Sequence, residues 1–315
     1  MNIAVVGAGA IGGFLAAALA RSGAQVSVVA RGAHLEAIAG RGITLVHSDL
    51  GPFTARVAAA GDLRDLMPPD VVICAFKAHQ WPELREQFAV LAGGHTTIVT
   101  LQNGVPFWYV RDEPLRSVDP GGRIGAAFPD ERVIGGVVHV SGHIVEPGRI
   151  HQSGGTRYAL GLPGGGTSDV LEALAAAMRG AELQPELYED IREMVWLKLV
   201  NNVGLNAVSA FYDKTIRQML ESPPLRARVA ALMSEALAVG QRLGVVRDVD
   251  IEARLGYAER LGDVRTSMLQ DRLAGRPLEL EPIHGAVVEL GDRLGVPVER
   301  VREIYERLRG LAANP

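Results

Sequence analysis

The sequence has only one cysteine, Cys74, among its 315 residues, and this cysteine lies inside the apolar run 71–76. A single cysteine cannot form an intramolecular disulfide, which excludes the class of small secreted proteins that disulfides hold together. We therefore expect a reducing compartment, the cytoplasm. Aromatic residues make up only 5% of the chain, and Ala, Val, Leu and Gly dominate, a bias that favours helices packed closely on a sheet.

The sequence also lacks an excess of basic residues and a long uninterrupted apolar run. Its 32 Lys and Arg are balanced by 36 Asp and Glu, and no basic stripe is visible, which argues against a nucleic-acid partner. No run of about 18 apolar residues is uninterrupted by glycine or charge, so we expect no membrane span. His139, His143 and His151 lack a metal-ligand spacing and are interpreted as strand surface, so no metal site is expected.

The N-terminus carries a nucleotide-binding pattern. Residues 3–6 predict a short buried strand, the motif Gly7-Ala-Gly9-Ala-Ile-Gly12 follows at once, and a helical pattern begins after it. In this arrangement the first glycine permits the tight turn, the second lets the backbone approach a pyrophosphate, and the third lets the helix lie close to the sheet. The helix N-terminus then offers unpaired N–H groups to the phosphates. The predicted dinucleotide contacts are Gly7, Gly9, Ala10, Ile11 and Gly12.

The end of the second predicted strand, residues 25–29, distinguishes between two cofactors. It leads into Ala30-Arg31-Gly32, where an NAD site would usually have an acidic residue for the ribose 2′-hydroxyl. The charge and donor fork of Arg31 suit a 2′-phosphate, which favours NADP(H). The alternative is an ordinary surface arginine.

Two further predicted strands, 71–76 and 97–101, end in the polar sequences Lys77-Ala-His-Gln and Gln102-Asn103-Gly104. Ligands bind outside the carboxyl ends of strands in open α/β sheets, so Gly7, Arg31, Lys77 and Asn103 could converge on one crevice. Each of these residues alone is equally typical of a loop. From about residue 124 short strands predict antiparallel additions to the sheet, and residues 169–179 predict a helix.

The second half of the chain has helical periodicity throughout. We predict an α/β protein with a Rossmann-type dinucleotide-binding domain over residues 1–187 and an all-α helical bundle domain over residues 188–315. Lys198, Asn202 and Asn206 follow one another at spacings of four in an apolar stretch, which puts them near one helix face. A partly buried lysine can donate a proton, since burial lowers its pKa. The alternative is a lysine that extends its amine from the helix edge to solvent.

Two segments near the C-terminus, 266–271 and 279–285, also carry polar groups. Ser267 could be an N-cap, and Glu279 could simply complement a helix dipole. From the residues alone neither is assigned to a site.

Taken together, these motifs give the chain a resemblance to the ketopantoate reductase (2-dehydropantoate 2-reductase) family over essentially its whole length. The residues that carry it are the glycine motif 7–12, Arg31, Lys77-Ala-His-Gln, Gln102-Asn103-Gly104, Trp196-Leu-Lys198 with Asn202 and Asn206, Ser267-Met-Leu-Gln-Asp271 and Gly275-Arg276-Pro277-x-Glu279.

The resemblance implies NADPH-dependent reduction of 2-dehydropantoate to pantoate, a step toward coenzyme A, at a site between a Rossmann domain and a helical domain. It implies Lys198 as the general acid and Glu279 as the glutamate that assists the lysine and substrate. Asn103 would lie beside the nicotinamide and substrate, and Asn202, Asn206 and Ser267 would hold the substrate. Arg31 and Lys77 would contact the cofactor.

The chain departs from the family pattern near Glu279. Leu278 stands where the family commonly has Thr, and Pro282 and His284 stand where it has Tyr and Asn. Another branched or aromatic 2-oxo acid is therefore an alternative substrate. A non-catalytic NADPH sensor is a further alternative, although a sensor would need neither Lys198 nor Glu279. The role of residues 107–122 and the oligomeric state, with a homodimer as one option, are left open.

Overall fold

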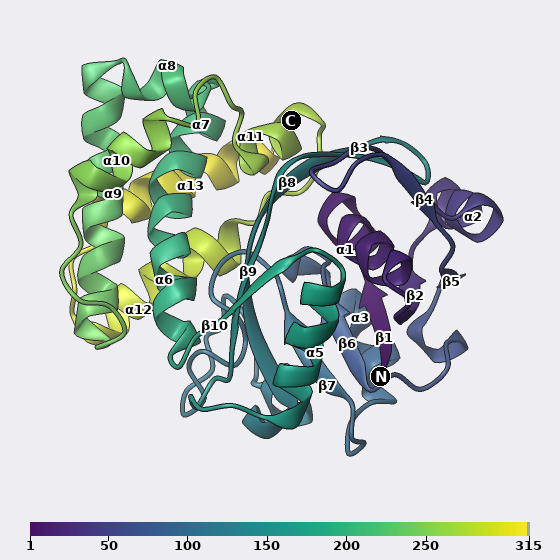
Figure 1. Cartoon of the computed structure of the whole chain (residues 1–315). Helices are drawn as coiled ribbons and strands as arrows, with labels where there is room; N and C mark the ends of the chain where they lie inside the picture. Colours follow the sequence, from purple (N-terminus) through teal and green to yellow (C-terminus); the bar gives the residue numbers. More distant parts are fainter. Residues whose placement is uncertain (314–315) are drawn as a thin grey trace. The chain divides into compact units, whose positions relative to one another are not determined.

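The computed structural model describes residues 1–313, and the chain forms two compact units (Figure 1). Unit 1 comprises Met1–Gln102 and Arg123–Ile191, and unit 2 comprises Asn103–Gly122 and the chain from Arg192 onward. The predicted fold class is confirmed, since a mixed α/β sheet region precedes a helical region. No helix within residues 1–313 is both long and apolar enough to cross a membrane.

Unit 1 is built on one sheet, which has ten strands within the described residues. The path through it runs β4-β3-β9-β8-β7-β6-β1-β2-β5, and β10 pairs with β9. The strands are β1 (Asn2–Val6), β2 (Gln25–Val29), β3 (Ile43–His47), β4 (Phe53–Ala55), β5 (Ala58–Ala60), β6 (Val71–Cys74), β7 (Thr97–Thr100), β8 (Val133–Glu146), β9 (Arg149–Gly161) and β10 (Gln184–Leu187). The pairs β1–β2, β1–β6, β6–β7 and β7–β8 are parallel, so the expected antiparallel addition is wrong for β8, which joins β7 in parallel. The next strand, β9, pairs with β8 in the expected antiparallel direction.

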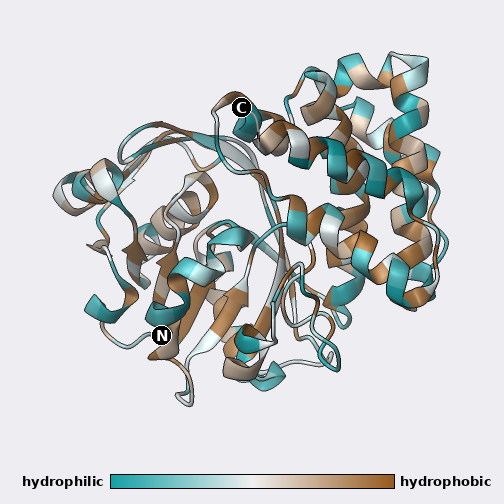
Figure 2. Ribbon diagram, turned by 180° about the vertical axis from the view of Figure 1, so that it is seen from behind, coloured by the Kyte–Doolittle hydropathy of each residue, from teal (hydrophilic) through white to brown (hydrophobic). Residues whose placement is uncertain are grey.

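The helices of unit 1 pack on this sheet. They are α1 (Ala10–Arg21), α2 (Gly32–Arg41), α3 (Trp81–Ala89), α4 (Arg123–Ala127) and α5 (Asp169–Gly180), with 3-10 turns at Leu63–Asp65, Ala78–Gln80 and Asp130–Arg132. Helix α1 contacts β1 and β2 as well as β3, β4, β8 and β9, because these outer strands arch over it (Figure 1). Phe14, Leu15 and Leu19 of α1 are buried in the core, and apolar residues are concentrated along the strands (Figure 2).

Unit 2 is helical. Its elements are α6 (Ile191–Asn201), α7 (Ala207–Tyr212), α8 (Ile216–Leu220), α9 (Pro223–Arg242), α10 (Ile251–Glu259), α11 (Ser267–Leu273), α12 (Ala286–Leu294) and α13 (Glu299–Ala313). Two π-helical turns interrupt this pattern, η4 (Asn202–Asn206) before α7 and η5 (Glu281–Gly285) before α12. Helix α9 contacts η4, α7, α8, α10, α12 and α13, and it therefore organises the bundle.

The rotation of α6 is fixed by Trp196. This side chain is fully buried, and its indole N–H donates to the Ala236 carbonyl on α9 at 3.0 Å. A Cβ on Gly240 would lie 2.1 Å from the indole nitrogen, so only glycine lets α9 approach this closely. The contact determines which side of α6 carries Lys198.

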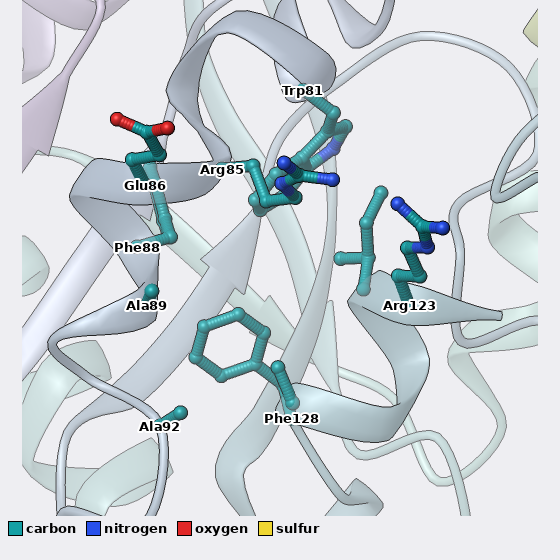
Figure 3. A pocket seen from close by; sticks show the side chains of 10 residues that line it. Trp81, Arg85, Glu86, Phe88, Ala89, Ala92, Arg123 and Phe128 are labelled. Carbon is teal, nitrogen blue, oxygen red and sulfur yellow. The ribbon is translucent and has the colours of Figure 1, made fainter.

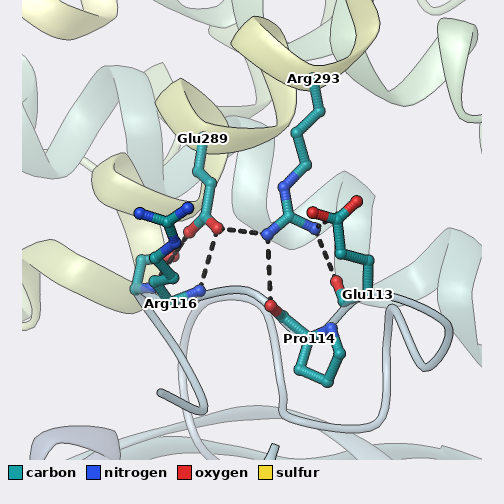
Figure 4. A network of polar contacts seen from close by, with 6 residues as sticks. Glu113, Pro114, Arg116, Glu289 and Arg293 are labelled. Carbon is teal, nitrogen blue, oxygen red and sulfur yellow. Dashed lines mark hydrogen bonds and ion pairs between the residues drawn. The ribbon is translucent and has the colours of Figure 1, made fainter. Parts of the chain in front are cut away.

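The segment 103–122 belongs to unit 2, although the sequence analysis includes it in the first domain. The Glu289 carboxylate on α12 accepts the backbone N–H groups of Arg116 and Ser117 at 2.9 and 3.0 Å (Figure 4). Arg293 donates to the Pro114 carbonyl at 3.2 Å and also contacts Glu289 and Glu113. The bonds from α12 to this segment connect residues more than 170 positions apart, and sequence periodicity does not reveal such pairs.

Candidate functional site

The glycine motif of unit 1 has the conformation that its sequence predicts. Gly7 has a φ of +94°, and a Cβ on it would lie 2.7 Å from the Phe76 nitrogen. A Cβ on Gly12 would lie 2.2 Å from the Gly7 carbonyl oxygen, whereas a Cβ on Gly9 would meet nothing within 4 Å. The first and third glycines therefore serve the turn and the packing, and the open space lies beside the second.

Helix α1 begins beside this open space. Its N-cap is Gly9, which provides no side-chain cap, and its first turn contains no acidic residue. The first N–H groups of α1, at Ala10 and Ile11, thus have no side-chain acceptor and carry the positive end of the helix dipole. This arrangement fits the pyrophosphate of a dinucleotide.

His34 is a contributor to this loop that the sequence analysis missed. Its Nδ1 accepts the Gly148 N–H at 3.1 Å, so its Nε2 carries the proton and donates to the Ala8 carbonyl at 2.7 Å. His34 therefore connects the glycine motif to the β8–β9 turn. The position of His34, three residues after Arg31, does not indicate this role, because its hydrogen-bond partner Gly148 is distant in the sequence.

Arg31 and Lys77 follow β2 and β6, the two parallel neighbours of β1. The Arg31 guanidinium forms a 3.1 Å ion pair with Glu83, and both side chains are more than half exposed, at 54% and 60%. An exposed ion pair of this kind contributes little to stability, so the Arg31 guanidinium can leave Glu83 for another anion with little loss of free energy. Lys77 is partly buried and is the N-cap of the 3-10 turn Ala78–Gln80.

Asn103 lies in unit 2, together with Glu279. The Asn103 amide donates to the Glu279 carboxylate at 3.2 Å, and Glu279 is only 5% exposed. The next residue, Gly104, has a φ of +88°, and a Cβ there would lie 2.4 Å from the Pro282 carbonyl oxygen. This close approach lets the Val105 N–H donate to Pro282 at 2.7 Å, which fixes the segment that carries Asn103.

Lys198, Asn202 and Asn206 lie on α6 and the π-helical turn η4. In an α-helix, residues four apart overshoot one full turn by about 40°. A π turn contains more residues per turn, so the step from Asn202 to Asn206 falls back toward the line of the other two. Gly204 makes room for this wide turn, since a Cβ on it would lie 2.6 Å from the Met233 side chain on α9.

One amide of this line has a hydrogen-bonding group that the described residues leave unpaired. The Asn202 Nδ2 is buried without a hydrogen-bond partner among the described residues. Asn206 of the same line is 7% exposed. Buried polar groups in proteins are nearly always paired, so the unpaired Asn202 amide points to a polar ligand.

Ser267 is the first residue of α11, and it is exposed. The N-cap is Thr266, whose hydroxyl accepts the Leu269 N–H at 3.3 Å, so the interpretation of Ser267 as an N-cap is wrong. Because Ser267 is exposed, its hydroxyl is accessible to a ligand.

Arg254 of α10 is a second residue that the sequence analysis missed. It donates to the Asn201 side chain at 3.2 Å and lies 3.4 Å from the Leu197 carbonyl, in the last turn of α6. Burial lowers the pKa of its guanidinium. Arg254 thereby connects α10 to the helix that carries Lys198.

A separate apolar cavity of about 260 Å³ lies in unit 1 between α3 and α4 (Figure 3). Trp81 lines it and packs edge to face on Phe76 and Phe88, with ring centroids 4.9 and 4.8 Å apart. None of the residues predicted for the site lines this cavity.

Histidines form a row on the sheet of unit 1. His151 stacks on His47 and His143, with centroids 4.7 and 5.0 Å apart, on the paired strands β9, β3 and β8. Desolvation and the two neighbouring rings lower the pKa of His151. Stacked rings do not direct their nitrogens at one point, and no group of three His, Cys, Asp or Glu within residues 1–313 is arranged to hold a metal ion.

Comparison with known proteins identifies relatives over the whole chain. The family model described as ketopantoate reductase PanE/ApbA matches residues 3–165, and the model of its C-terminal part matches residues 190–312. A 2-dehydropantoate 2-reductase of Mesorhizobium japonicum is 40% identical over 322 residues, which cover 100% of this chain and 98% of that protein.

Solved structures agree with these matches. The structure of a candidate ketopantoate reductase from Ralstonia solanacearum MolK2 is 38% identical with a TM-score of 0.92, and the match covers 99% of this chain and 98% of that one. A D-mandelate dehydrogenase with NADH and anilino(oxo)acetate has a TM-score of 0.85 at 20% identity, with 99% of each chain covered. At that identity the likeness shows the fold alone.

Proposed function

The chain belongs to the ketopantoate reductase PanE/ApbA family of oxidoreductases, and from this premise we propose that it reduces 2-dehydropantoate to pantoate with NADPH. The observation that carries the proposal is the unpaired buried amide of Asn202, which lies on one line of unit 2 with Lys198 and Asn206. A small 2-oxo acid with hydroxyl and carboxylate groups would satisfy this amide.

The cofactor is a nicotinamide dinucleotide, as in relatives of this family, and we propose NADP(H) as the form used. The N–H groups at the start of α1 and the open side of Gly9 would hold the pyrophosphate. Arg31 would exchange Glu83 for the 2′-phosphate, which matches its donor fork and charge. Lys77 would be a further cofactor contact. A bound reduced nicotinamide supplies the hydride.

Lys198 acts in the proposed reaction as the general acid. Negative charge develops on the ketone oxygen as hydride arrives at the carbonyl carbon. An ammonium at hydrogen-bond distance stabilises this charge and donates the proton. Lys198 would then recover its proton from solvent.

The other residues orient the reactants. Asn202, Asn206 and Ser267 would hold the substrate hydroxyl and carboxylate. Glu279 is proposed to assist Lys198 and the substrate, and its carboxylate keeps the Asn103 amide in one direction. This orientation would let Asn103 contact both the nicotinamide and the substrate.

Other 2-oxo acids are a second candidate substrate class, because Leu278, Pro282 and His284 depart from the family pattern. Replacement of a tyrosine by Pro282 removes an aromatic ring and a hydroxyl close to Glu279. A pocket changed in this way would accept a different branched or aromatic side chain. A non-catalytic NADPH sensor is the weaker alternative, because it has no use for Lys198 or Glu279.

Initial rates of NADPH oxidation test the proposal. The substrates are 2-dehydropantoate, 2-oxoisovalerate, which lacks the hydroxymethyl group, and benzoylformate, which is aromatic. We expect 2-dehydropantoate to have the highest kcat/KM. A higher value for either other acid would move the assignment to that class. Tight NADPH binding without turnover of any acid would instead favour the sensor.

A further inference from the structure

We propose that His284 is a positioning residue that joins the two π-helical turns of unit 2 and thereby fixes the Asn202–Asn206 line relative to Glu279. The inference rests on the proposed function, because it assigns these residues to substrate and proton transfer. It goes beyond that proposal by naming what holds them in register.

The turn η4 leaves one backbone carbonyl without its α-helical hydrogen bond. In an α-helix the Ala207 N–H would bond to the carbonyl of Val203, four residues earlier. Here it bonds to Gly204 instead, so the Val203 carbonyl lacks its α-helical donor. Val203 is fully buried, and a buried carbonyl without a partner would destabilise the fold.

His284 supplies the missing donor from η5. Its Nε2 lies 3.2 Å from the Val203 oxygen, and because a carbonyl only accepts, Nε2 must carry the proton. The side chain is fully buried, at 0% exposure, and its Nδ1 has no partner among the described residues. Burial lowers the pKa of His284 to about 4, so the ring is neutral at physiological pH.

The turn η5 likewise leaves a second carbonyl without its α-helical hydrogen bond. The Ala286 N–H bonds to Glu281, five residues earlier, and not to Pro282. The Pro282 carbonyl accepts the Val105 N–H at 2.7 Å. Thus η5 binds the Asn103 segment through Pro282 and the Asn202–Asn206 turn through His284, and Glu279 lies two residues before its first residue in the chain.

Two substitutions distinguish the hydrogen-bonding role of His284 from a role in packing the core alone. His284→Gln can place an amide N–H near the position of Nε2, whereas His284→Leu keeps similar bulk and removes the donor. All rates are measured well below the melting temperature of each variant, so that only folded protein is compared. The acid used is whichever 2-oxo acid the wild-type protein reduces best.

We expect His284→Leu to lose at least about tenfold in kcat/KM for the acid, with the KM for NADPH within about twofold, and His284→Gln to recover most of the loss. A lowered melting temperature with unchanged kcat and KM in His284→Leu would overturn the proposal, because His284 would then serve stability alone. Equal losses in both variants would also contradict it.

Hydrogen exchange gives a readout that does not need turnover. We expect His284→Leu to speed amide exchange in residues 202–207 and to leave residues 10–21 of unit 1 unchanged. Unchanged exchange at 202–207 would overturn the positioning role. If wild type reduces no oxo acid, the proposed function fails, and the exchange result still decides whether His284 joins the two turns.

Discussion

Asn202 has a buried amide nitrogen without a partner among the described residues, and Asn206, four residues later, is 7% exposed. An unsatisfied buried donor costs about 1–3 kcal/mol, so such groups persist where a ligand binds them. Their spacing from Lys198 is visible in the sequence and predicts the shared helix face. The lack of a hydrogen-bond partner cannot be read from the sequence, because it depends on which groups of α9 and η5 lie near the amide in the folded protein.

The choice between NADPH and NADH is predicted to depend on Arg31. Loss of a charge-assisted bond to the 2′-phosphate costs about 1.5–3 kcal/mol, so Arg31→Ala should raise the KM for NADPH roughly 10- to 100-fold. The KM for NADH should change little. Steady-state kinetics with both cofactors measure this.

Glu83→Gln is the matched control for Arg31, because it removes the competing carboxylate and keeps the guanidinium. The KM for NADPH should fall or stay the same in this variant. Equal weakening of NADPH and NADH in Arg31→Ala would show that Arg31 does not read the 2′-phosphate.

His284 should make stability depend on pH. Its pKa is about 4 in the folded protein against 6.5 for a histidine side chain in water, because burial disfavours the cation. The unfolded state therefore binds more protons between these values. The contribution is fully present above the unfolded pKa and is lost as the pH falls toward 4.

From this one group we predict a free energy of unfolding about 2 kcal/mol smaller at pH 5 than at pH 8. Urea unfolding at both pH values measures it, with His284→Gln as the reference that lacks the titrating ring. Identical pH dependence in the two proteins would contradict the burial of a neutral imidazole.

The π-helical turns η4 and η5 are the elements that the sequence analysis did not predict. Asn202–Asn206 continues the periodicity of α6, and nothing in the residues themselves distinguishes a wide turn from a normal one. The cause lies in tertiary contacts. Gly204 allows α9 to approach, and His284 donates a hydrogen bond to the Val203 carbonyl that the wide turn leaves without its α-helical donor. Turns of this kind occur frequently at functional sites.

The sequence predicts the strands of the parallel part of the sheet, and two of these, β6 and β7, are buried along their whole length. Residues 25–29 match β2, and 71–76 and 97–101 contain β6 and β7. Short strands such as β4 and β5 were missed, because their three residues form strands only through pairing with β3 and β2. Long-range pairing of this kind leaves no local pattern.

The segment 103–122 is predicted to depend on Glu289. Partial burial opposes ionisation of this carboxyl, but the N–H groups of Ser117 and Arg116, the Ser117 hydroxyl and the charge of Arg293 lower its pKa. Glu289→Gln should reduce the free energy of unfolding by about 1–3 kcal/mol and raise the KM for the oxo acid, because Asn103 begins this segment.

Urea unfolding and steady-state kinetics measure the effect of Glu289→Gln. Glu303→Gln is the control, since its contact with Arg307 joins side chains that are about half exposed, at 48% and 51%, and should be worth at most about 1 kcal/mol. A Glu289→Gln protein as stable as the control would show that the network in Figure 4 does not hold the segment.

At the scale of the whole molecule, the sequence predicted the order of an α/β region and a helical region. This prediction succeeded because strand patterns occur only in the first part of the chain, where they alternate with helices, whereas the second part has helical periodicity throughout. The expected division at residue 187 lies near the start of α6, but residues 103–122 join unit 2 through bonds to Glu289 and Arg293. That segment has no period of its own, so its partners could not be read from the sequence.

The central claim is that this protein is a 2-oxo acid reductase in which Lys198 donates the proton. The most direct test is the initial rate of NADPH oxidation with 2-dehydropantoate, compared between wild type, Lys198→Ala and Lys198→Arg. We predict a fall in kcat of about 10²- to 10⁴-fold in Lys198→Ala, with little change in the KM for NADPH. Arginine should not restore it, since its guanidinium does not give up a proton. A Lys198→Ala protein that keeps a kcat within a few-fold of wild type would contradict the account.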